Sequence, residues 1–456
     1  MKGSMLQSST YINEQRRSYS LYVLQSRAIP AITDGLKASG RRALWTGRDG
    51  HKWKTANLAG STMPIHPHAE CSSSINTLTA PYGNNITLFK GDGAFGTLIN
   101  PTAYGASRYT SVTVSKFTQD VIFKDIEIIP MMENYDGTLQ EPVHFLPLVP
   151  IALLNPAEGI AVGYSTNILP RALDDIIEAQ LAHLKGTFLS GKRQAAAMMP
   201  HFTPLKNKAY TSEVTDTGIA YYFNGDIVRH DMTNLTITKL PYGQTHKKVI
   251  AKLDDLMEKD TIQDYTDKSK DVINIEVKFK RGQLKDLDDV ILFRLLGITV
   301  RHIENLNVLD FTGSAIWNTT PLDAICKFTN WRFGYYTARY QRLLDIVVAD
   351  MQRYIDIRNA IKNNIAGFAK KTQSRAELKE LLFDMGIVNI DYIADLPVYR
   401  FTQDEHVKNE ERIKEAQNTM DNYKHLLSSD SERKKVYISE LQEVLTNYNK
   451  GKYERS

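Results

Sequence analysis

An arginine and a tyrosine stand side by side as Arg108 and Tyr109, in a segment (residues 105–117, GASRYTSVTVSKF) whose composition favours a strand. A tyrosine phenol has a pKa of about 10, so it is a poor nucleophile unless its surroundings stabilise its anion or the charge it attacks. An arginine is permanently charged and suits phosphate. The pair can therefore react at phosphorus or merely pack, as helical spacing predicts for the Arg-Tyr pairs at 339–340 and 353–354.

A second cluster, IHPHAEC, brings His66, His68 and Cys71 close together in sequence. This spacing could hold part of a zinc site, but such a site needs a further pair of ligands, and the sequence has no second Cys/His cluster. We therefore predict no metal site. Histidines beside basic residues more often bind phosphate or transfer protons.

Two motifs that could bind nucleotides are weak. The loop GDGAFG at residues 91–96 fits the dinucleotide pattern, yet Pro101 and Gly105 disfavour the helix that must follow it. Asp286 and Asp288 resemble a magnesium motif but precede a helix, where capping is the expected role. No Walker phosphate loop occurs, so any ATP or Mg²⁺ would be supplied by another chain.

Composition indicates a globular protein of two to four domains, since 456 residues with 42% hydrophobic content can bury real cores. Two distant cysteines and a polar N-terminal segment favour the cytoplasm and give no sign of export. The apolar stretch 143–168 is interrupted by prolines and a glutamate, so we expect buried turns and no membrane span. Residues 1–60 hold 10 Lys or Arg against 3 Asp or Glu, a local net charge of +7 that could grip phosphates or form a solvated face.

Three regions must position these residues. The first, to about residue 167, mixes short helical patterns with glycine-rich turns. The second shows strand alternation in two segments. In NLTITKL it places Leu235, Ile237 and Leu240 on one face of a strand, and in VINIEVKFK the alternating residues are Ile273, Ile275, Val277 and Phe279. THKKVIAKLDDLMEKD, between them, predicts a helix.

The third region, from Trp331 on, predicts two long helices. Their apolar seams repeat at steps of three and four and are formed by Tyr340, Leu344, Val347, Met351 and Tyr354, and by Ile413, Ala416, Met420, Tyr423 and Leu427. We expect an antiparallel arm with a small globular tip at residues 374–401; an ordinary helical bundle is the alternative.

The order of six motifs resembles the breakage-reunion subunit of type IIA DNA topoisomerases. These motifs are SRAIPAITDGLKASGRRAL, HPHAE, KGDGAFG, GASRYT, ENYDGT and GIAVGYSTNI. The likeness is greatest to the A subunits of DNA gyrase and topoisomerase IV and to the medium subunit of T-even phage topoisomerase. It is dense from about Tyr22 to Pro170 and thinner afterwards.

The resemblance implies that Tyr109 is the nucleophile, which becomes joined to a 5′ phosphate, and that Arg108 stabilises the transition state. It implies that DNA is bound by Arg27, Lys37, Arg41, Arg42, His66 and His68. Either His66 or His68 would also assist the leaving 3′ oxygen. Ile160 would be a wedge that enters a base step, although core packing is the alternative for this residue.

The implied fold is α+β and multidomain. It has a winged-helix DNA-cleavage domain at 1–168, a mixed α/β tower domain at 169–330, and a long antiparallel coiled-coil arm with a helical exit-gate tip at 331–456. The chain would form a homodimer through the arm and the winged-helix domain. Mg²⁺ and ATP would be bound by a gyrase B-like partner subunit.

The implied activity is relaxation or decatenation of double-stranded DNA by passage of a second duplex through a transient break. We expect no negative supercoiling, because no region long enough for a DNA-wrapping domain follows the arm, and this short form favours a phage-type subunit in a bacterial host cytoplasm. Two alternatives stay open: a DNA-binding scaffold without catalysis, and a metal or dinucleotide enzyme.

Overall fold

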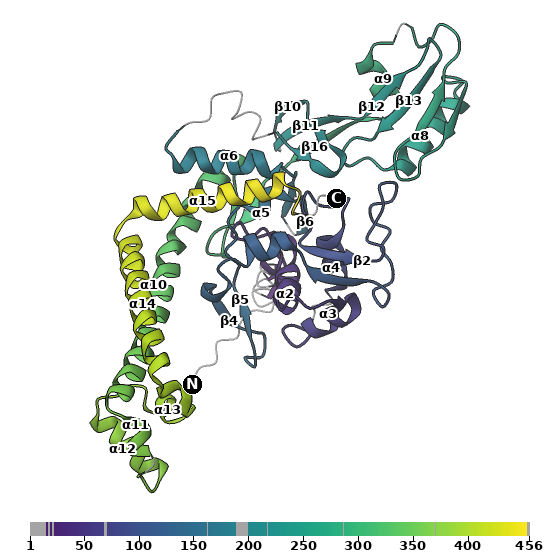
Figure 1. Ribbon diagram of the computed structural model, residues 1–456. Coiled ribbons are helices and arrows are strands. Elements are labelled where there is room, and N and C mark those ends of the chain that lie inside the picture. The colour runs from purple at the N-terminus through teal and green to yellow at the C-terminus, as the bar shows by residue number, and fades with distance from the viewer. Residues whose placement is uncertain are drawn as a thin grey trace, which may run out of the picture. The chain divides into compact units, whose positions relative to one another are not determined.

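The computed structural model describes residues 15–16, 19–20, 22–67, 71–161, 163–187, 199–216, 218–285, 287–369 and 371–453 (Figure 1). The chain divides into two compact units, one formed by Met1–Arg332 with Ile438–Ser456 and the other by Phe333–Tyr437. Across the described ranges, no helix combines the length and apolar character needed to cross a membrane.

Three short helices and a small antiparallel sheet form the part of the first unit that holds Tyr109. After the π-helix η1 (Leu24–Ala28), the helices are α2 (Ala38–Thr46), α3 (Thr55–Thr62) and α4 (Ser72–Thr79). The sheet has the order β1-β3-β2, with strands β1 (Trp53–Lys54), β2 (Phe89–Asp92) and β3 (Ser111–Val114). Helix α2 contacts both other helices, and Leu44, Leu58 and Ile75, one from each helix, are fully buried.

Two hairpins and short helices follow in the same unit. The elements are η2 (Thr118–Ile122), η3 (Ile126–Ile128), β4 (Met131–Glu133), β5 (Gln140–Pro142), α5 (Ile151–Leu154), β6 (Ala157–Ala161), β7 (Tyr164–Ile168) and α6 (Leu173–Leu184). Strands β4 and β5 pair with each other, as do β6 and β7. The predicted apolar stretch is buried only in part: residues 144–155 are buried, whereas Glu158, Ile160 and Tyr164 in the β6–β7 hairpin are exposed.

Two further sheets lie in the region after residue 200. One has the order β10-β11-β16, formed by β10 (Thr211–Thr215), β11 (Gly218–Asn224) and β16 (Thr299–Glu304). The other has the order β12-β13-β15-β14, formed by β12 (Asp226–Arg229), β13 (Asn234–Lys239), β15 (Ile275–Lys278) and β14 (Asp264–Asp267). Short connecting elements are β8 (His201–Phe202), η4 (Thr203–Leu205), β9 (Asn207–Lys208), β17 (Asn307–Leu309) and β18 (Ile316–Asn318).

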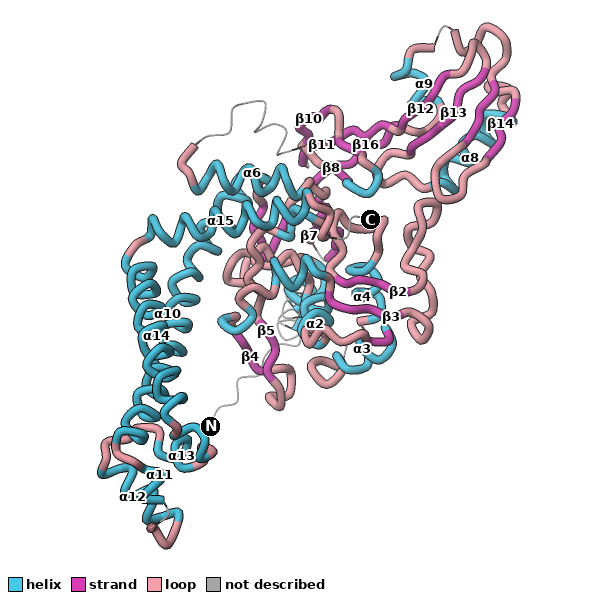
Figure 2. Tube along the Cα trace, viewed as in Figure 1, coloured by secondary structure: helices cyan, strands magenta, loops and turns pink. Residues whose placement is uncertain are grey.

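The predicted strand faces are confirmed in the four-stranded sheet, shown in magenta in Figure 2. Leu235 lies opposite Val277 and Ile237 opposite Ile275, and all four side chains are buried in one cluster. The predicted helix is α8 (His246–Glu258), which begins where the Thr245 side chain accepts a hydrogen bond from the Lys248 amide. Asp288 caps α9 (Asp289–Leu295) in the same way, as predicted, whereas Asp286 lies outside the described residues.

Most of one long helix and the whole of another lie in the second unit and run antiparallel, as predicted (Figure 1). Helix α10 (Pro321–Lys362) and helix α14 (Gln403–Ser428) contact each other through Tyr340 and Tyr423, one from each expected seam, and α15 (Asp430–Asn449) follows α14. The rings of Tyr340 and Tyr423 lie 5.8 Å apart, and 14 residues further along α10 the carbonyl of Tyr354 accepts a hydrogen bond from Asn409, 14 residues earlier than Tyr423. The second contact lies the same number of residues forward in α10 as it lies backward in α14, so the two helices run antiparallel.

A small tip with its own core joins these helices. Its elements are α11 (Ile365–Ala369), α12 (Arg375–Asp384), α13 (Ile390–Ala394) and η5 (Val398–Phe401). Ile365, Leu382, Ile387 and Ile393 form a buried cluster with residues from the end of α10. The tip therefore packs as the compact segment that the sequence predicts.

Candidate DNA-cleavage site

Tyr109 lies in a tight turn that immediately precedes β3, and this corrects the expectation of a strand at this residue. The amides of Tyr109 and Thr110 both donate to the carbonyl of Ala106, at 2.8 and 3.3 Å, and the strand begins only at Ser111. The turn reverses the chain and leaves the Tyr109 side chain 71% exposed.

Helix α3 anchors this turn from one side. The amide of Ala56 donates to the Ser107 carbonyl and the amide of Thr55 donates to the Thr110 carbonyl, each at 3.1 Å. The hydroxyls of Thr55 and Thr110 also form a buried hydrogen bond of 2.7 Å. These paired contacts fix the backbone on both sides of Tyr109, so the exposed phenol projects from a rigid base.

Two cationic side chains lie close to the phenol and its backbone. The Arg108 guanidinium lies over the Tyr109 ring, 4.8 Å from the ring centre, and the Lys54 ammonium donates to the Tyr109 carbonyl at 3.3 Å. Positive charge is therefore concentrated where a phosphate would approach the phenolic oxygen. Sequence reasoning missed Lys54 as an individual residue, although it belongs to the basic surplus of residues 1–60.

The glycine-rich loop supports the tyrosine turn and is not followed by a helix. The amide of Gly105 donates to the Ala94 carbonyl at 2.8 Å. Gly96 has φ +101°, and a Cβ atom there would lie 2.2 Å from the Pro101 carbonyl oxygen. Residues 93–110 are all described and contain no helix, so the dinucleotide interpretation lacks the helix N-terminus that would face a pyrophosphate.

A groove of about 1050 Å³ lies beside this turn and brings several predicted residues together. Arg27, Arg42, His66 and Ser107 line it, and Ser107 is the residue before Arg108. His66 is half-buried and Arg27 is exposed. His68 lies outside the described residues.

Cys71, the third member of the histidine cluster, is enclosed by protein. Its side chain is fully buried, and its thiol donates to the Ser39 carbonyl at 3.4 Å. Burial raises the pKa of the thiol, against weaker opposing effects of Thr62 and Arg42. A protonated, enclosed thiol is a poor zinc ligand.

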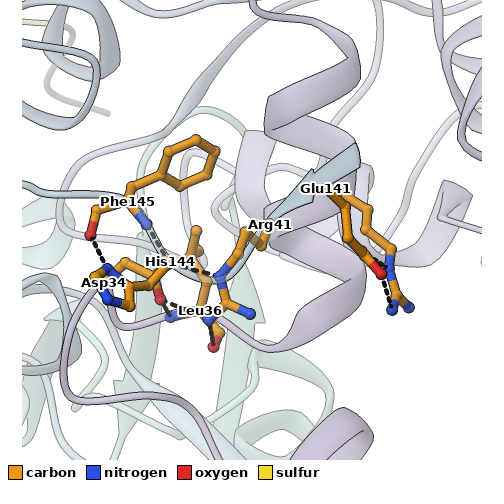
Figure 3. A network of polar contacts seen from close by, with 7 residues as sticks. Asp34, Leu36, Arg41, Glu141, His144 and Phe145 are labelled. Carbon is orange, nitrogen blue, oxygen red and sulfur yellow. Dashed lines mark hydrogen bonds and ion pairs between the residues drawn. The ribbon is translucent and has the colours of Figure 1, made fainter. Parts of the chain in front are cut away.

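Arg41 and Arg42 each form a bidentate ion pair inside the protein. Arg41 donates to both carboxylate oxygens of Asp34, at 2.6 and 2.9 Å, as Figure 3 shows. Arg42 donates to Glu141 in the same way, at 2.6 and 3.1 Å. Burial disfavours the charged form of Arg41, but the attraction of Asp34 outweighs it and raises the pKa of the guanidinium.

Asp34 is the centre of a wider network (Figure 3). Its carboxylate also accepts hydrogen bonds from the backbone amides of Leu36 and Phe145, at 3.1 and 3.0 Å. The Arg42–Glu141 pair therefore joins α2 to β5, and Asp34 joins Arg41 of α2 to the segment that follows β5. Neither carboxylate partner was found from the sequence, and for Arg42 no local pattern indicates a partner 99 positions away.

A second groove, of about 670 Å³, brings Arg27, Lys37 and Ile160 together. Ile160 lies on β6, near the end of the β6–β7 hairpin, and is 87% exposed. The Lys37 ammonium donates to the Glu158 carbonyl at 2.6 Å, and burial lowers the pKa of Lys37 against the opposing charge of Glu158. Arg27 lines both grooves and so connects their cationic residues.

Comparison with known proteins gives a consistent result. The model of the family that comprises the A subunits of DNA gyrase and topoisomerase IV matches residues 27–442. The medium subunit of DNA topoisomerase from Enterobacteria phage T4 is 27% identical, over 88% of this chain and 92% of its own length.

Cellular relatives are longer than the segment they share with this chain. The A subunit of DNA topoisomerase 4 from Borreliella burgdorferi is 29% identical over 60% of this chain and 43% of its own length. The A subunit of DNA gyrase from Chlamydia trachomatis is 26% identical over 95% of this chain and 55% of its own length. The matched region thus spans about half of these relatives and almost all of the phage subunit.

Proposed function

The chain belongs to the family of DNA gyrase and topoisomerase IV A subunits, which are type IIA DNA topoisomerases, and we propose from this that it is the DNA-cleaving and rejoining component of an ATP-dependent enzyme. Tyr109 forms a transient 5′-phosphotyrosine link in each strand of one duplex. A second duplex passes through the break before it is resealed, which relaxes or decatenates DNA. The complex acts in the bacterial cytoplasm.

The single observation that supports this chemistry best is the exposed phenol on a rigid turn. Tyr109 is 71% exposed, whereas the backbone beside it is fixed by the hydrogen bonds between Thr55 and Thr110. A nucleophile for a large substrate must be both accessible and preorganised, because positioning supplies much of the rate enhancement in phosphoryl transfer.

The reaction exchanges one phosphoester for another. The Tyr109 oxygen bonds to phosphorus while the bond from phosphorus to the 3′ oxygen breaks; the phenol loses a proton and the 3′ oxygen gains one. Arg108 lies beside the ring and stabilises the charge that develops on the phosphoryl oxygens. His66 or His68 supplies the proton to the 3′ oxygen. Religation reverses these steps and retains the bond energy.

We propose that the two grooves bind the backbone of the cleaved duplex. Arg27, Lys37 and His66 present cationic or donor groups in these grooves. Arg41 and Arg42 would contact phosphates only through donor groups beyond those that hold Asp34 and Glu141. Ile160 is the proposed wedge, and its 87% exposure supports insertion into DNA more than core packing.

The domain arrangement is also a proposal. A winged-helix domain would cover residues 1–168, a tower domain 169–330 and the arm 331–456, as the resemblance implies. The chain would dimerise through the winged-helix domain and the arm. Exposed apolar residues on the tip support a dimer contact there, since Phe383, Val398 and Tyr399 are 71, 72 and 63% exposed.

The partner subunit would supply the Mg²⁺ site and the ATPase. In the part of the chain that the structure describes, no three carboxylate, histidine or cysteine side chains gather in a way that could hold a metal ion. The chain's own residues provide the nucleophile, the phosphate contacts and the proton transfer.

The decisive test traps the covalent intermediate. The protein is mixed with its ATPase partner, Mg²⁺ and plasmid, quenched with detergent and digested, and the DNA-linked peptide is identified by mass spectrometry. We expect DNA on the Tyr109 peptide of wild type, and none with Tyr109→Phe, which keeps the ring but removes the attacking oxygen.

Two other results would each overturn the proposal. Failure of wild type to form the adduct, while both proteins bind DNA in the presence of the partner, would favour a non-catalytic scaffold. A metal or dinucleotide bound stoichiometrically to the purified chain, with no adduct, would favour the third class of protein.

A further inference from the structure

His66 is held between two tyrosines that come from different parts of the chain. Its Nε2 atom lies 3.1 Å from the Tyr22 hydroxyl, and its ring forms an edge-to-face contact with the Tyr135 ring at a centroid distance of 5.8 Å. Tyr22 precedes η1, whereas Tyr135 belongs to the ENYDGT motif in the β4–β5 hairpin. The proposed chemistry gives neither tyrosine a role.

The segment that carries His66 has no regular structure to orient the imidazole. Residues 63–67 follow the end of α3 as turns, and the next described residue is Cys71. A histidine on such a loop samples several rotamers unless neighbouring groups hold it. Tyr22 and Tyr135 contact the ring from outside this loop and restrict its orientation.

Hydrogen bonds within the β4–β5 hairpin, and from it to the segment of His66, hold the backbone around Tyr135. Buried Asn134 accepts a hydrogen bond from the Leu139 amide at 3.0 Å and donates to the Pro64 carbonyl at 3.1 Å, two residues before His66. Asp136 accepts from the amide and hydroxyl of Thr138, at 3.1 and 2.6 Å. The hairpin loop is thus closed on itself and tied to the histidine segment.

Packing does not explain the position of Tyr135, because its side chain is largely exposed to solvent. Its side chain is 56% exposed, so burial contributes little to the stability of the hairpin. The interaction that its ring makes with His66 is the more informative feature, because an edge-to-face contact depends on orientation.

We infer that Tyr22 and Tyr135 are positioning residues that hold the His66 imidazole toward the cleaved phosphodiester, with Tyr22 fixing the Nε2 edge and Tyr135 fixing the ring plane. The inference rests on the proposed function. It also assigns the proton transfer to His66, because this clamp acts on that histidine.

The size of the effect is limited by what the histidine itself contributes. A positioned general acid typically contributes about 10²- to 10⁴-fold, and a loosened one keeps part of that. We expect Tyr135→Ala to slow cleavage about 10-fold or more, within that limit. Tyr135→Phe keeps the ring contact and should cleave like wild type.

The Tyr22 hydroxyl has its own prediction. Tyr22→Phe removes only the hydrogen bond to Nε2, so the cleavage rate should fall while plasmid affinity changes little. Tyr210→Ala is the matched control for Tyr135→Ala. Tyr210 is 51% exposed, close to the 56% of Tyr135, and it lines neither groove.

The experiment measures single-turnover cleavage of plasmid by the complete complex, together with plasmid affinity and the unfolding temperature of each variant. A double-mutant cycle distinguishes an effect exerted through His66 from a general loss of structure. If Tyr135 acts through His66, then adding Tyr135→Ala to His66→Ala should lower the cleavage rate little further. The effects of substitutions at residues that act as a unit are not additive.

Each outcome decides a different question. Tyr135→Ala cleaving at the wild-type rate, or losing the same factor with and without His66, would overturn the clamp while leaving Tyr109 as nucleophile. Loss of cleavage in Tyr135→Phe as large as in Tyr135→Ala would also overturn it. Wild type that forms no adduct would refute the proposed function itself, which is a separate result.

Discussion

The Arg108 guanidinium lies 4.8 Å from the centre of the Tyr109 ring, close enough to stay beside the phenol when its oxygen bonds to phosphorus. Negative charge then grows on the phosphoryl oxygens, and a fixed cation stabilises that charge more than it stabilises the bound substrate. Lys54 adds a second positive charge at the backbone of the same residue. The turn thus presents a nucleophile together with its electrostatic support.

We predict that Arg108→Ala lowers the cleavage rate by about 10²- to 10³-fold with little loss of plasmid affinity, since its role lies in the transition state. Single-turnover cleavage and fluorescence anisotropy measure the two quantities. Arg353→Ala is the matched control, because Arg353 lies over Tyr392 in the second unit at 5.7 Å and should leave cleavage unchanged. Equal losses of affinity and rate in Arg108→Ala would contradict this role.

Arg41 and Arg42 show what the sequence could not predict at individual residues. Both are basic residues shortly before the histidine cluster, and nothing in the sequence distinguishes them from other cations available for DNA. In the fold their side chains are about one-tenth exposed, at 11 and 12%, and paired with Asp34 and Glu141. Burial and long-range pairing depend on the tertiary structure, which a local pattern does not contain.

The glycine-rich loop is the element on which the tyrosine turn depends. Gly96 adopts φ +101°, and an added Cβ would come within 2.2 Å of the Pro101 carbonyl oxygen. Both the backbone conformation and the space exclude other residues. The loop therefore has to deform if this glycine is replaced.

We predict that Gly96→Ala destabilises the loop by about 1–3 kcal/mol and slows cleavage, because the strain is transmitted to the turn that Gly105 joins to Ala94. Thermal unfolding and single-turnover cleavage test this. Gly334→Ala is the control: nothing lies within 4 Å of its added Cβ in helix α10, and Gly334 lines neither groove, so it should be neutral or slightly stabilising. Unchanged cleavage in Gly96→Ala would argue against coupling between loop and turn.

The elements that the sequence predicted correctly have a repeating pattern. In β13 and β15 apolar residues alternate, so Leu235, Ile237, Ile275 and Val277 share one buried face. In the arm, steps of three and four bring Tyr340 to Tyr423. Tyr109 was misplaced on a strand because Ser-Val-Thr-Val favours one, while contacts with residues 55–56, more than 50 positions earlier, bend the chain before it.

For the first unit as a whole, buried ion pairs join distant parts of the chain. Arg171 and Glu304 form a bidentate pair at 2.9 and 2.7 Å, and their side chains are 0 and 3% exposed. Glu304 also accepts the Leu169 amide at 2.9 Å. A second buried pair joins Arg332 to Asp125.

We predict that Arg171→Ala lowers the free energy of unfolding by about 3–5 kcal/mol, because it leaves the Glu304 carboxylate buried without its partner. Chemical denaturation measures the change. Lys116→Ala should cost at most about 0.5 kcal/mol, since it breaks only the exposed pair with Asp120. A loss for Arg171→Ala as small as that of the surface variant would contradict the assigned role of this pair.

His144 makes the stability of the same unit depend on pH. Burial lowers its pKa, against the opposing charge of Asp34 and the hydrogen bond that Nδ1 donates to the Phe145 carbonyl (Figure 3). The unfolded imidazole, with a pKa of about 6.5, therefore takes up a proton before the folded one does. Stability should be complete above pH ~6.5 and fall as the pH decreases toward the lowered folded value.

We predict that His144→Asn flattens this acid dependence while retaining an amide donor for the Phe145 carbonyl. Unfolding temperatures measured between pH 5 and 8 test it, with His51→Asn as the control because the His51 side chain is 78% exposed. A slope that persists unchanged in His144→Asn would assign the dependence to other groups.

The pairing of Arg171 with Glu304 also limits when this part of the core can form during synthesis of the chain. The two residues are separated by 133 positions, so a ribosome adding about 5–20 residues per second needs roughly 7–27 s to reach the glutamate after the arginine. During that interval the arginine must remain in water, because an unpaired charge is costly to bury. This part of the core consequently closes late, and a nascent chain stalled before residue 304 should still be open to proteases around Arg171.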